Sequence, residues 1–452
     1  MSITTIVFMT VYLIGIVLTL YHPMYGVLMY FFEWHNHPPY WWWGKNLPDP
    51  RWSLLIAALT VVSLILNRKK LRVFEDFNYQ PLIWLILIVI NSYMVSFLFA
   101  LDPSESLRKS EVLLKLAINY FLMIYIIRNP REYSWIIFII IACVANFGRV
   151  AWEQGSNRDL GVIAPGATSG NLIASYMMTI VPFYATAFLL GNRWMKLFTI
   201  IAVPFVLNAL ILENSRGTIL GLFSMAVVAP FLVKGKLRLR LIIGLVFAAI
   251  IFLQLTNQQF WERQSTTTHY KEDSGANTRF ILWKGAYNFL KDHPFGGGGD
   301  SFIMVADQYC PELREKFMEH GNRTVHNTYL NTATDWGYAG LILFLGFLIH
   351  SIVLMRRVKR DAKYSPDFNF YNIQAVGLLL AMTGALVAYV FYSRQYAENL
   401  YWFSAFGVAL RNIQLAEMKK HARETQKVGE EESTEEFDHE AELVPHHRSF
   451  PT

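Results

Sequence analysis

Charge is scarce in this sequence: only 16% of the 452 residues are charged, whereas 54% are hydrophobic. Apolar runs long enough to cross a membrane recur along the chain, and a soluble core of this size would not need them. The N-terminus also lacks the basic start and the small-residue cleavage site of a signal peptide, so we expect its first apolar run to be a retained anchor. These features predict an all-α polytopic membrane protein in contact with a lipid bilayer.

Cysteine is equally scarce, which argues against a disulfide framework. Cys143 lies in an apolar run and Cys310 in a polar loop, so we expect no bridge between them. No Cys/His group has zinc-site spacing, because the close histidine pairs at 35 and 37 and at 446 and 447 lack further ligands nearby. We expect no metal, no cofactor and no nucleic-acid partner.

The apolar runs predict about twelve transmembrane helices, with a shorter run at 24–33 that is either a half-helix or a re-entrant piece. The expected spans lie near 4–20, 54–67, 81–100, 112–127, 134–148, 171–190, 196–212, 217–233, 240–255, 338–355, 373–391 and 398–412. Basic segments between these spans all fall on one face, which is therefore cytoplasmic. Twelve spans place both chain ends in the cytoplasm, whereas a thirteenth through 24–33 would place the N-terminus outside.

This topology divides the chain into four parts. Residues 1–255 form the N-terminal transmembrane helices, 256–336 a large external insertion, and 337–412 the C-terminal transmembrane helices. A polar loop as long as the insertion is more often functional than decorative. The tail at 413–452 is expected to be cytoplasmic and largely disordered, because eight glutamates and one aspartate crowd its last 32 residues.

Three predicted helix starts carry the candidate chemistry. In "ENSRG" (213–217), Asn214 and Ser215 look like a helix cap, which places Arg216 in the first turn. In "SGANTRFILW" (274–283), Asn277 or Thr278 caps a helix that begins at Arg279. In "VHNTYL" (325–330), Asn327 caps a helix that ends at Gly337, so His326 lies at its positive end and stays neutral.

Together these residues predict an anion site beside a general base on the external face. Helix N-termini bind anions, the arginine fork matches phosphate oxygens, and a neutral imidazole accepts a proton. The catalytic candidates are Arg216, Arg279 and His326. Residues expected to bind substrate beside them are Arg149, Arg323, Trp283, Asn327 and Tyr329.

Each candidate also has an ordinary structural interpretation. Arg216 is equally compatible with an interfacial arginine or a pair with Glu213. Arg279, taken alone, fits a solvated helix residue, and His326 fits a loop or capping histidine. The composition of the insertion does not rank His326 above its other histidines, and packing of the loop also explains Trp283 and Tyr329.

The stretches "ENSRGTILGLF", "NTRFILWKGAYNFLKDHPFGGGG" and "HNTYLNTATDWGYAGLILFL" resemble, in order and spacing, the O-antigen ligase/polymerase superfamily. "YHPMYGVLMYFFEWHNHPP" and "GVIAPGATSGNLIASYMMTIVPF" are similar to an exosortase-associated O-glycosylation ligase branch of it. The four-residue glycine run and the acidic tail depart from the pattern.

The resemblance implies a GT-C-like fold with a helical periplasmic loop in the bacterial inner membrane. It implies an undecaprenyl-diphosphate-linked glycan donor and a glycan, lipid or protein acceptor. The roles it implies are diphosphate binding for Arg216 and Arg279 and base catalysis for His326, with no metal. Within the superfamily, a ligase, a polymerase and a protein O-oligosaccharyltransferase stay open. From a different class, a lipid-linked glycan flippase or a non-catalytic scaffold also stays open, although no internal repeat supports a transporter.

Overall fold

The computed structural model describes residues 2–69, 71, 77–155, 164–256, 258, 260–261 and 274–442, and these residues form helices and turns with no strand among them. The expected all-α fold is therefore confirmed. The helices are α1 (Ile3–Tyr21), α2 (Pro23–His35), α3 (Trp52–Leu66), α4 (Gln80–Leu98), α5 (Pro103–Ile126), α6 (Pro130–Glu153), α7 (Gly170–Leu190), α8 (Arg193–Glu213), α9 (Arg216–Leu232), α10 (Gly235–Leu255), α12 (Ser274–Asp292), α13 (Ser301–Tyr309), α14 (Arg314–His320), α15 (Thr328–Asp361), α16 (Phe368–Ala388) and α17 (Glu398–Glu442).

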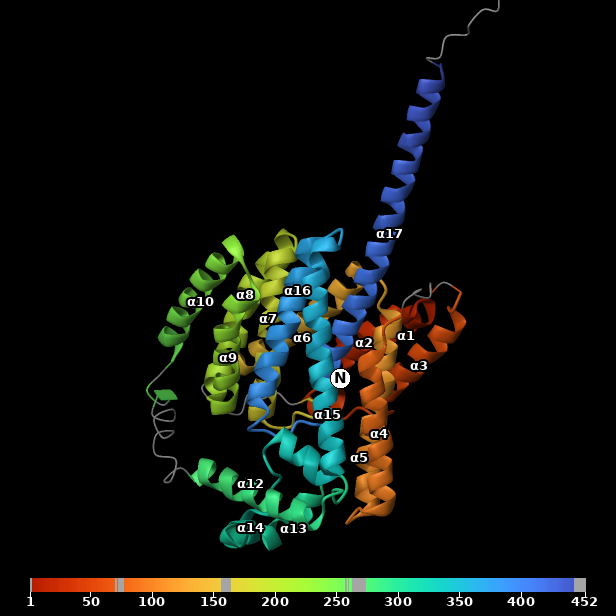
Figure 1. Ribbon diagram of the computed structural model, residues 1–452. Helices are drawn as coiled ribbons and strands as arrows, with labels where there is room; N and C mark the ends of the chain where they lie inside the picture. The colour runs from red at the N-terminus through yellow and green to blue at the C-terminus, as the bar shows by residue number, and fades with distance from the viewer. Residues whose placement is uncertain are drawn as a thin grey trace, which may run out of the picture.

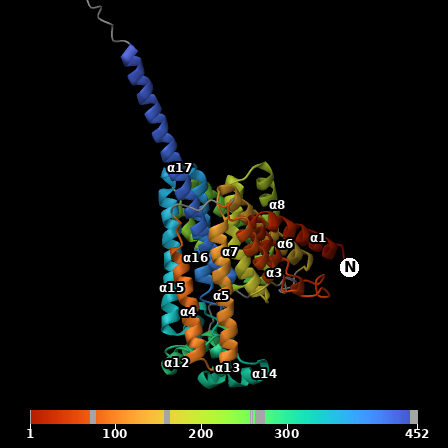
Figure 2. The same cartoon turned by 90° about the vertical axis from the view of Figure 1, so that its right-hand side faces the viewer.

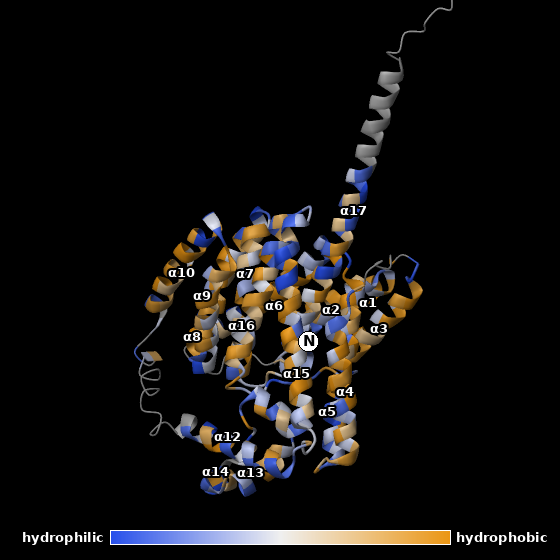
Figure 3. Ribbon diagram, viewed as in Figure 1, coloured by the Kyte–Doolittle hydropathy of each residue, from blue (hydrophilic) through white to orange (hydrophobic). Residues whose placement is uncertain are grey.

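Most of these helices form one bundle (Figure 1). Eight described helices are long and apolar enough to cross a membrane, and α3 and α9 are shorter apolar helices. Many large apolar side chains of these helices are exposed, and the ribbons of the bundle are largely orange, the colour of hydrophobic residues, in Figure 3; a protein surrounded by lipid has this arrangement. The chain is thus a multi-pass membrane protein, while the number of twelve crossings stays a prediction.

The short apolar run before residue 36 is a separate helix, α2, which runs back beside α1. Thr5 Oγ1, near the start of α1, donates to the Trp43 carbonyl (2.9 Å), whereas the Leu20 carbonyl, near its end, accepts from Asn67 Nδ2 (3.1 Å). Asn67 opens the first basic segment, and α17 reaches that same end of the bundle. The choice between twelve and thirteen crossings, and with it the placement of both chain ends in the cytoplasm, stays a prediction.

The insertion is a small helical unit at one end of the bundle (Figures 1 and 2). Its helices α12, α13 and α14 share a separate apolar core, as expected of a folded helical loop. The buried members of that core are Leu282, Ala286, Phe289, Phe302, Ala306, Cys310, Leu313, Phe317 and Val325.

At the other end of the bundle, α17 extends as one helix to Glu442. The expectation of a largely disordered tail from residue 413 is not met over the residues that the structure describes. The physical reason is composition, since Ala, Glu, Lys, Gln and Arg predominate after residue 414 and are strong helix formers. Acidic and basic side chains four residues apart, such as Lys420 and Glu424 (3.8 Å), add to this preference.

Candidate active site

Arg216 lies where α8 ends and α9 begins. Ser215 is the N-cap of α9 and Arg216 is its first residue, so the predicted first-turn position is confirmed. Asn214, however, belongs to the end of α8, where it adopts the left-handed conformation (φ 50°). The Ser215 side chain makes no capping hydrogen bond to α9. Its hydroxyl is directed to another part of the chain.

That other part is Tyr392, in the segment 389–397 that joins α16 to α17. Its hydroxyl is hydrogen-bonded to Ser215 Oγ and lies 3.4 Å from Thr218 Oγ1. Its ring lies against Gly217, where an added Cβ would be only 2.9 Å from Tyr392 Cε2. The glycine after Arg216 is therefore required by the close approach of this ring. Sequence reasoning missed Tyr392, because nothing distinguishes it among 23 tyrosines.

His326 immediately precedes the cap of α15. Asn327 Oδ1 accepts from the backbone N–H groups of Tyr329 and Leu330, both at 3.0 Å, so the predicted cap is confirmed. His326 itself is in the left-handed conformation (φ 53°). A residue with a side chain rarely adopts this conformation, and such strain concentrates at functional sites.

The start of α15 is fastened to the same 389–397 segment that contacts α9. The Thr328 N–H donates to the Tyr389 carbonyl (2.9 Å), and Thr328 Oγ1 donates to the Tyr392 carbonyl (2.6 Å). Tyr392 thus joins two regions far apart in sequence: its side chain holds the turn at Arg216, and its main chain holds the helix that follows His326.

Burial, together with the positive charges of Arg279 and Arg323, lowers the pKa of His326 to about 4, and burial is the largest of these causes. The imidazole is therefore neutral at neutral pH. The sequence predicted a neutral ring from the helix dipole, but in the structure burial and the two arginines are the main causes. Arg279 also acts electrostatically on Tyr392, as does the buried carboxylate of Glu213.

These contacts gather the three catalytic candidates around Tyr392. The residues on both sides of Arg216 contact Tyr392, Arg279 lies within electrostatic reach of both Tyr392 and His326, and His326 is two residues from Thr328. Among the residues that the structure describes, the acidic group that acts on Tyr392 is Glu213. Three arginines against one carboxylate give this region an excess of positive charge.

The predicted position of Arg279 within its helix is wrong. The expected cap at Asn277 or Thr278 lies inside α12, which begins at Ser274, so Arg279 is in the second turn. The dipole argument made for a first-turn arginine therefore does not apply to it. Trp283, one turn further, packs against Phe391 (ring centroids 6.3 Å apart) and thereby brings α12 to the 389–397 segment.

The remaining substrate-binding candidates differ in their placement. Arg323 is exposed and lies within electrostatic reach of His326. Tyr329 donates its hydroxyl to the Leu386 carbonyl (2.9 Å), which fixes α15 to α16. Arg149 pairs with Glu153 and donates to Asn146 Oδ1 (3.0 and 3.1 Å), and both of these partners lie on its own helix, α6.

The glycine run at 296–299 has a structural role that the sequence did not reveal. The Gly297 and Gly298 N–H groups donate to the Thr334 and Asp335 carbonyls (2.9 and 3.0 Å), and the Gly297 carbonyl accepts from the Leu101 N–H (2.8 Å). Gly298, at φ 89°, comes so close to α5 that an added Cβ would lie 2.6 Å from Ser106 Oγ. The run therefore clamps the insertion between α5 and α15.

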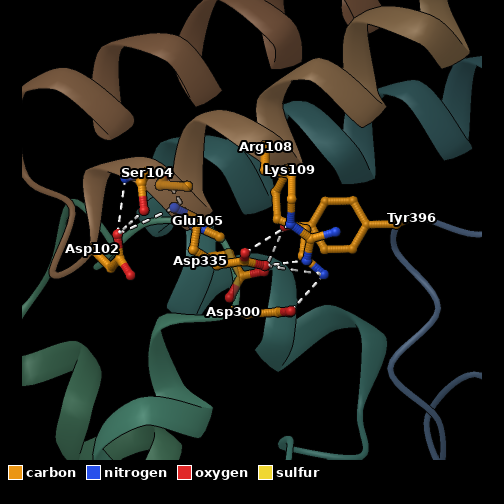
Figure 4. A network of polar contacts seen from close by, with 10 residues as sticks. Asp102, Ser104, Glu105, Arg108, Lys109, Asp300, Asp335 and Tyr396 are labelled. Atoms are coloured by element: carbon orange, nitrogen blue, oxygen red, sulfur yellow. Dashed lines mark hydrogen bonds and ion pairs between the residues drawn. The ribbon is translucent and has the colours of Figure 1, made fainter.

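A buried polar network surrounds this glycine clamp (Figure 4). Lys109 of α5 pairs with Asp300 (2.5 Å), the residue that follows the glycine run. Asp335 of α15 is fully buried, and its Oδ2 accepts hydrogen bonds from Tyr396 (2.7 Å), Asn331 (3.1 Å) and Gln395 (3.2 Å). This network ties the first turns of α15 to the 389–397 segment and so supports the position of His326.

The fold and this site define a multi-pass helical membrane protein whose inserted helical unit carries a half-buried histidine within electrostatic reach of two arginines. Residues 200–345, about a third of the chain, match the family described as O-Antigen ligase. This match supports the resemblance to the O-antigen ligase/polymerase superfamily seen in the motifs, and the matched residues include Arg216, Arg279 and His326. None of the curated proteins compared with the chain matches it.

Proposed function

We propose that the protein is a membrane glycosyltransferase that moves a glycan from an undecaprenyl-diphosphate carrier to an acceptor hydroxyl, with inversion at the anomeric carbon. The observation that carries this proposal is the grouping of a neutral imidazole with an excess of arginine around Tyr392. The O-antigen ligase match supports the same class of reaction.

In the proposed reaction, His326 accepts the proton of the acceptor hydroxyl while the hydroxyl oxygen attacks the anomeric carbon. The bond between that carbon and the diphosphate oxygen breaks, and the diphosphate leaves with the bonding electrons. Arg216 and Arg279 stabilise the negative charge that grows on the leaving group, a role in which preorganised charge is most effective. Because the arginines supply this positive charge, the proposed mechanism needs no metal.

The proposal also fixes where the reaction occurs. The basic loops lie at the end of the bundle from which α17 extends, and the insertion with His326 lies at the other end. By the positive-inside rule the insertion is then periplasmic, in a bacterial inner membrane. This is the side on which a flipped lipid-linked glycan is available.

The test is transfer by the purified full-length protein in liposomes that contain a labelled lipid-linked glycan, with lipid, glycan and peptide acceptors in parallel. Arg216→Ala and His326→Ala should each lower the rate by about 10²–10³-fold, as loss of one group that stabilises a transition state does. The control is Arg314→Ala, which changes an exposed arginine of α14 in the same insertion. Near-normal transfer by either variant removes that residue from the mechanism.

A further inference from the structure

Beyond Tyr392, the 389–397 segment leads to a second polar cluster that the proposed mechanism does not use. Arg394 is only 2% exposed; its N–H donates to Thr328 Oγ1 (3.0 Å) and its Nη1 donates to the Gly166 carbonyl. Glu398, the first residue of α17, lies beside the same glycine, whose added Cβ would be 3.1 Å from Glu398 Oε2. Thr328, which accepts this hydrogen bond from Arg394, is two residues along the chain from His326, so the cluster contacts the chain close to the proposed base.

The end of α2 and the loop after it complete this cluster. Trp34, 3% exposed, lies beside the Glu398 carboxylate and packs on Trp402 (ring centroids 4.9 Å apart). Tyr40 is half-buried and within electrostatic reach of Glu398. We call Trp34, Tyr40, Arg394 and Glu398 the Glu398 cluster.

The loop that carries Tyr40 is held in place by a buried carboxylate. Glu33 accepts hydrogen bonds from Ser53 Oγ (2.6 Å) and from His37, whose ring lies 5.4 Å from the ring of Tyr40. The motif "EWHNHPPY" (33–40) thus supplies Trp34 and Tyr40, the two members of the cluster from the N-terminal half. Because the loop is held by Glu33, Tyr40 has a fixed orientation.

The cluster contains an unusual concentration of buried polar atoms that lack partners. Within the part of the chain that the structure describes, Arg394 Nε and Glu398 Oε2 are shielded from solvent and make no hydrogen bond, whereas the Trp34 side chain acts as a hydrogen-bond partner of the Glu398 carboxylate. Asn399 Oδ1, on the next residue along the chain, shares this property. Each such atom costs about 1–3 kcal/mol, and they are rare in folded proteins. Several in one place indicate a bound molecule that both donates and accepts hydrogen bonds.

Charge separates this cluster from the region around His326. There, arginines outnumber carboxylates, which favours an anion such as a diphosphate. In the Glu398 cluster, one arginine and one carboxylate interact and balance each other, so a neutral ligand fits best. Sugar hydroxyls donate and accept at once, and the apolar face of a pyranose ring packs on an aromatic ring such as Tyr40.

We propose that the Glu398 cluster binds a neutral sugar ring of the acceptor and holds it with a hydroxyl directed at His326. The proposal rests on the proposed function, since it names the acceptor subsite of the same reaction. In it, Glu398 accepts from one sugar hydroxyl, Arg394 donates to another, and Tyr40 packs on the ring face.

The test is binding, which does not require transfer. Full-length protein in detergent is titrated calorimetrically with cellobiose, maltose, lactose and chitobiose, and with a serine- and threonine-containing hexapeptide. We expect at least one disaccharide to bind to the wild type. Glu398→Gln and Tyr40→Phe should both leave a folded protein. Glu398→Gln should weaken disaccharide binding at least about tenfold, the loss expected for a hydrogen bond to a charged group. Tyr40→Ala, at a half-buried position, provides the same test if Glu398→Gln does not fold.

Two controls separate this proposal from the proposed function. Glu153→Gln changes an exposed carboxylate of α6 and should leave disaccharide binding unchanged. His326→Ala should lose transfer yet retain disaccharide binding, so failure of the mechanism and failure of the acceptor subsite give different results. The subsite is overturned if no disaccharide binds, if Glu398→Gln and Tyr40→Ala bind as the wild type does, or if only the peptide binds and depends on Glu398.

Discussion

Two glycine contacts hold the candidate site together, and they do so by different means. At Gly298 the main chain of the insertion is hydrogen-bonded to α15 and lies directly on α5. At Gly217 a side chain, Tyr392, lies on α9 and is hydrogen-bonded to the neighbouring Ser215. The first contact attaches a whole folded unit to the bundle, whereas the second adjusts the position of one turn beside Arg216. Stability should therefore depend mainly on the first, and catalysis mainly on the second.

The largest effect is expected for Gly298→Ala. The new Cβ meets Ser106 Oγ at 2.6 Å, and a residue with a side chain is strained at φ 89°. Strain and overpacking should together lower the free energy of unfolding by about 2 kcal/mol or more, and transfer activity should fall with it. Thermal unfolding of the purified protein measures the loss. The control is Gly321→Ala, because Gly321 has a similar φ of 75° but an added Cβ there would meet no atom within 4 Å. If Gly298→Ala is as stable as the wild type, the glycine run does not clamp the insertion.

A smaller and more selective effect is expected at the second contact. Gly217→Ala forces Tyr392 to move and should lower the transfer rate by about 10²-fold, since displacement of catalytic groups by about 1 Å has that cost. Tyr392→Phe keeps the ring but removes the hydroxyl, and should lower the rate by about tenfold. Neither variant should unfold the protein, whereas Gly244→Ala, with open space around it, should change nothing. If Gly217→Ala and Tyr392→Phe lower the transfer rate only because they destabilise the fold, the distinction between the two contacts is wrong.

The smallest effect concerns pH. Burial and the two arginines lower the pKa of His326 to about 4, so the imidazole is neutral, and able to accept a proton, until the pH falls toward that value. Transfer should therefore lose activity near pH 4 and not near the ordinary histidine pKa of about 6.5. Arg323→Gln removes one positive charge, which raises the pKa of His326 and moves this loss to higher pH. Because Arg323 is exposed, the displacement should be a fraction of a pH unit and shrink at high salt.

The profile of kcat/KM against pH measures this displacement. Arg314→Gln is the matched control, because Arg314 is also an exposed arginine of the insertion but is not among the charges that act on His326. An acidic limb near pH 6.5 in the wild type, or an identical displacement in both variants, would contradict the assigned cause.

Local signals predicted the local parts of this structure. The cap at Asn327, the break of helical geometry at Gly337 and the place of Arg216 all follow from residue types that act within one helical turn. The start of α12 was misplaced because "SGANT" offers several caps in a row, and sequence alone does not choose among them. Helix α2 was left undecided because 13 residues are short for a membrane crossing.

The contacts that assemble the site were beyond the reach of sequence reasoning. Tyr392 and Ser215 are 177 residues apart, and neither residue type marks a partner at that distance. The same holds for Gly298 with Ser106, and for Glu398 with Trp34. Buried polar pairing of this kind depends on how the helices pack, whereas hydropathy and capping patterns report only on each helix by itself.

The left-handed backbone of His326 has a practical consequence for chemical complementation. Alanine at this position would have to keep a conformation that its Cβ opposes, whereas glycine adopts it without strain. His326→Gly should therefore leave the loop as it is and open a space shaped like the missing ring. Imidazole added in solution would then restore turnover in proportion to its concentration, which links the lost activity to a proton acceptor and not to a collapsed fold.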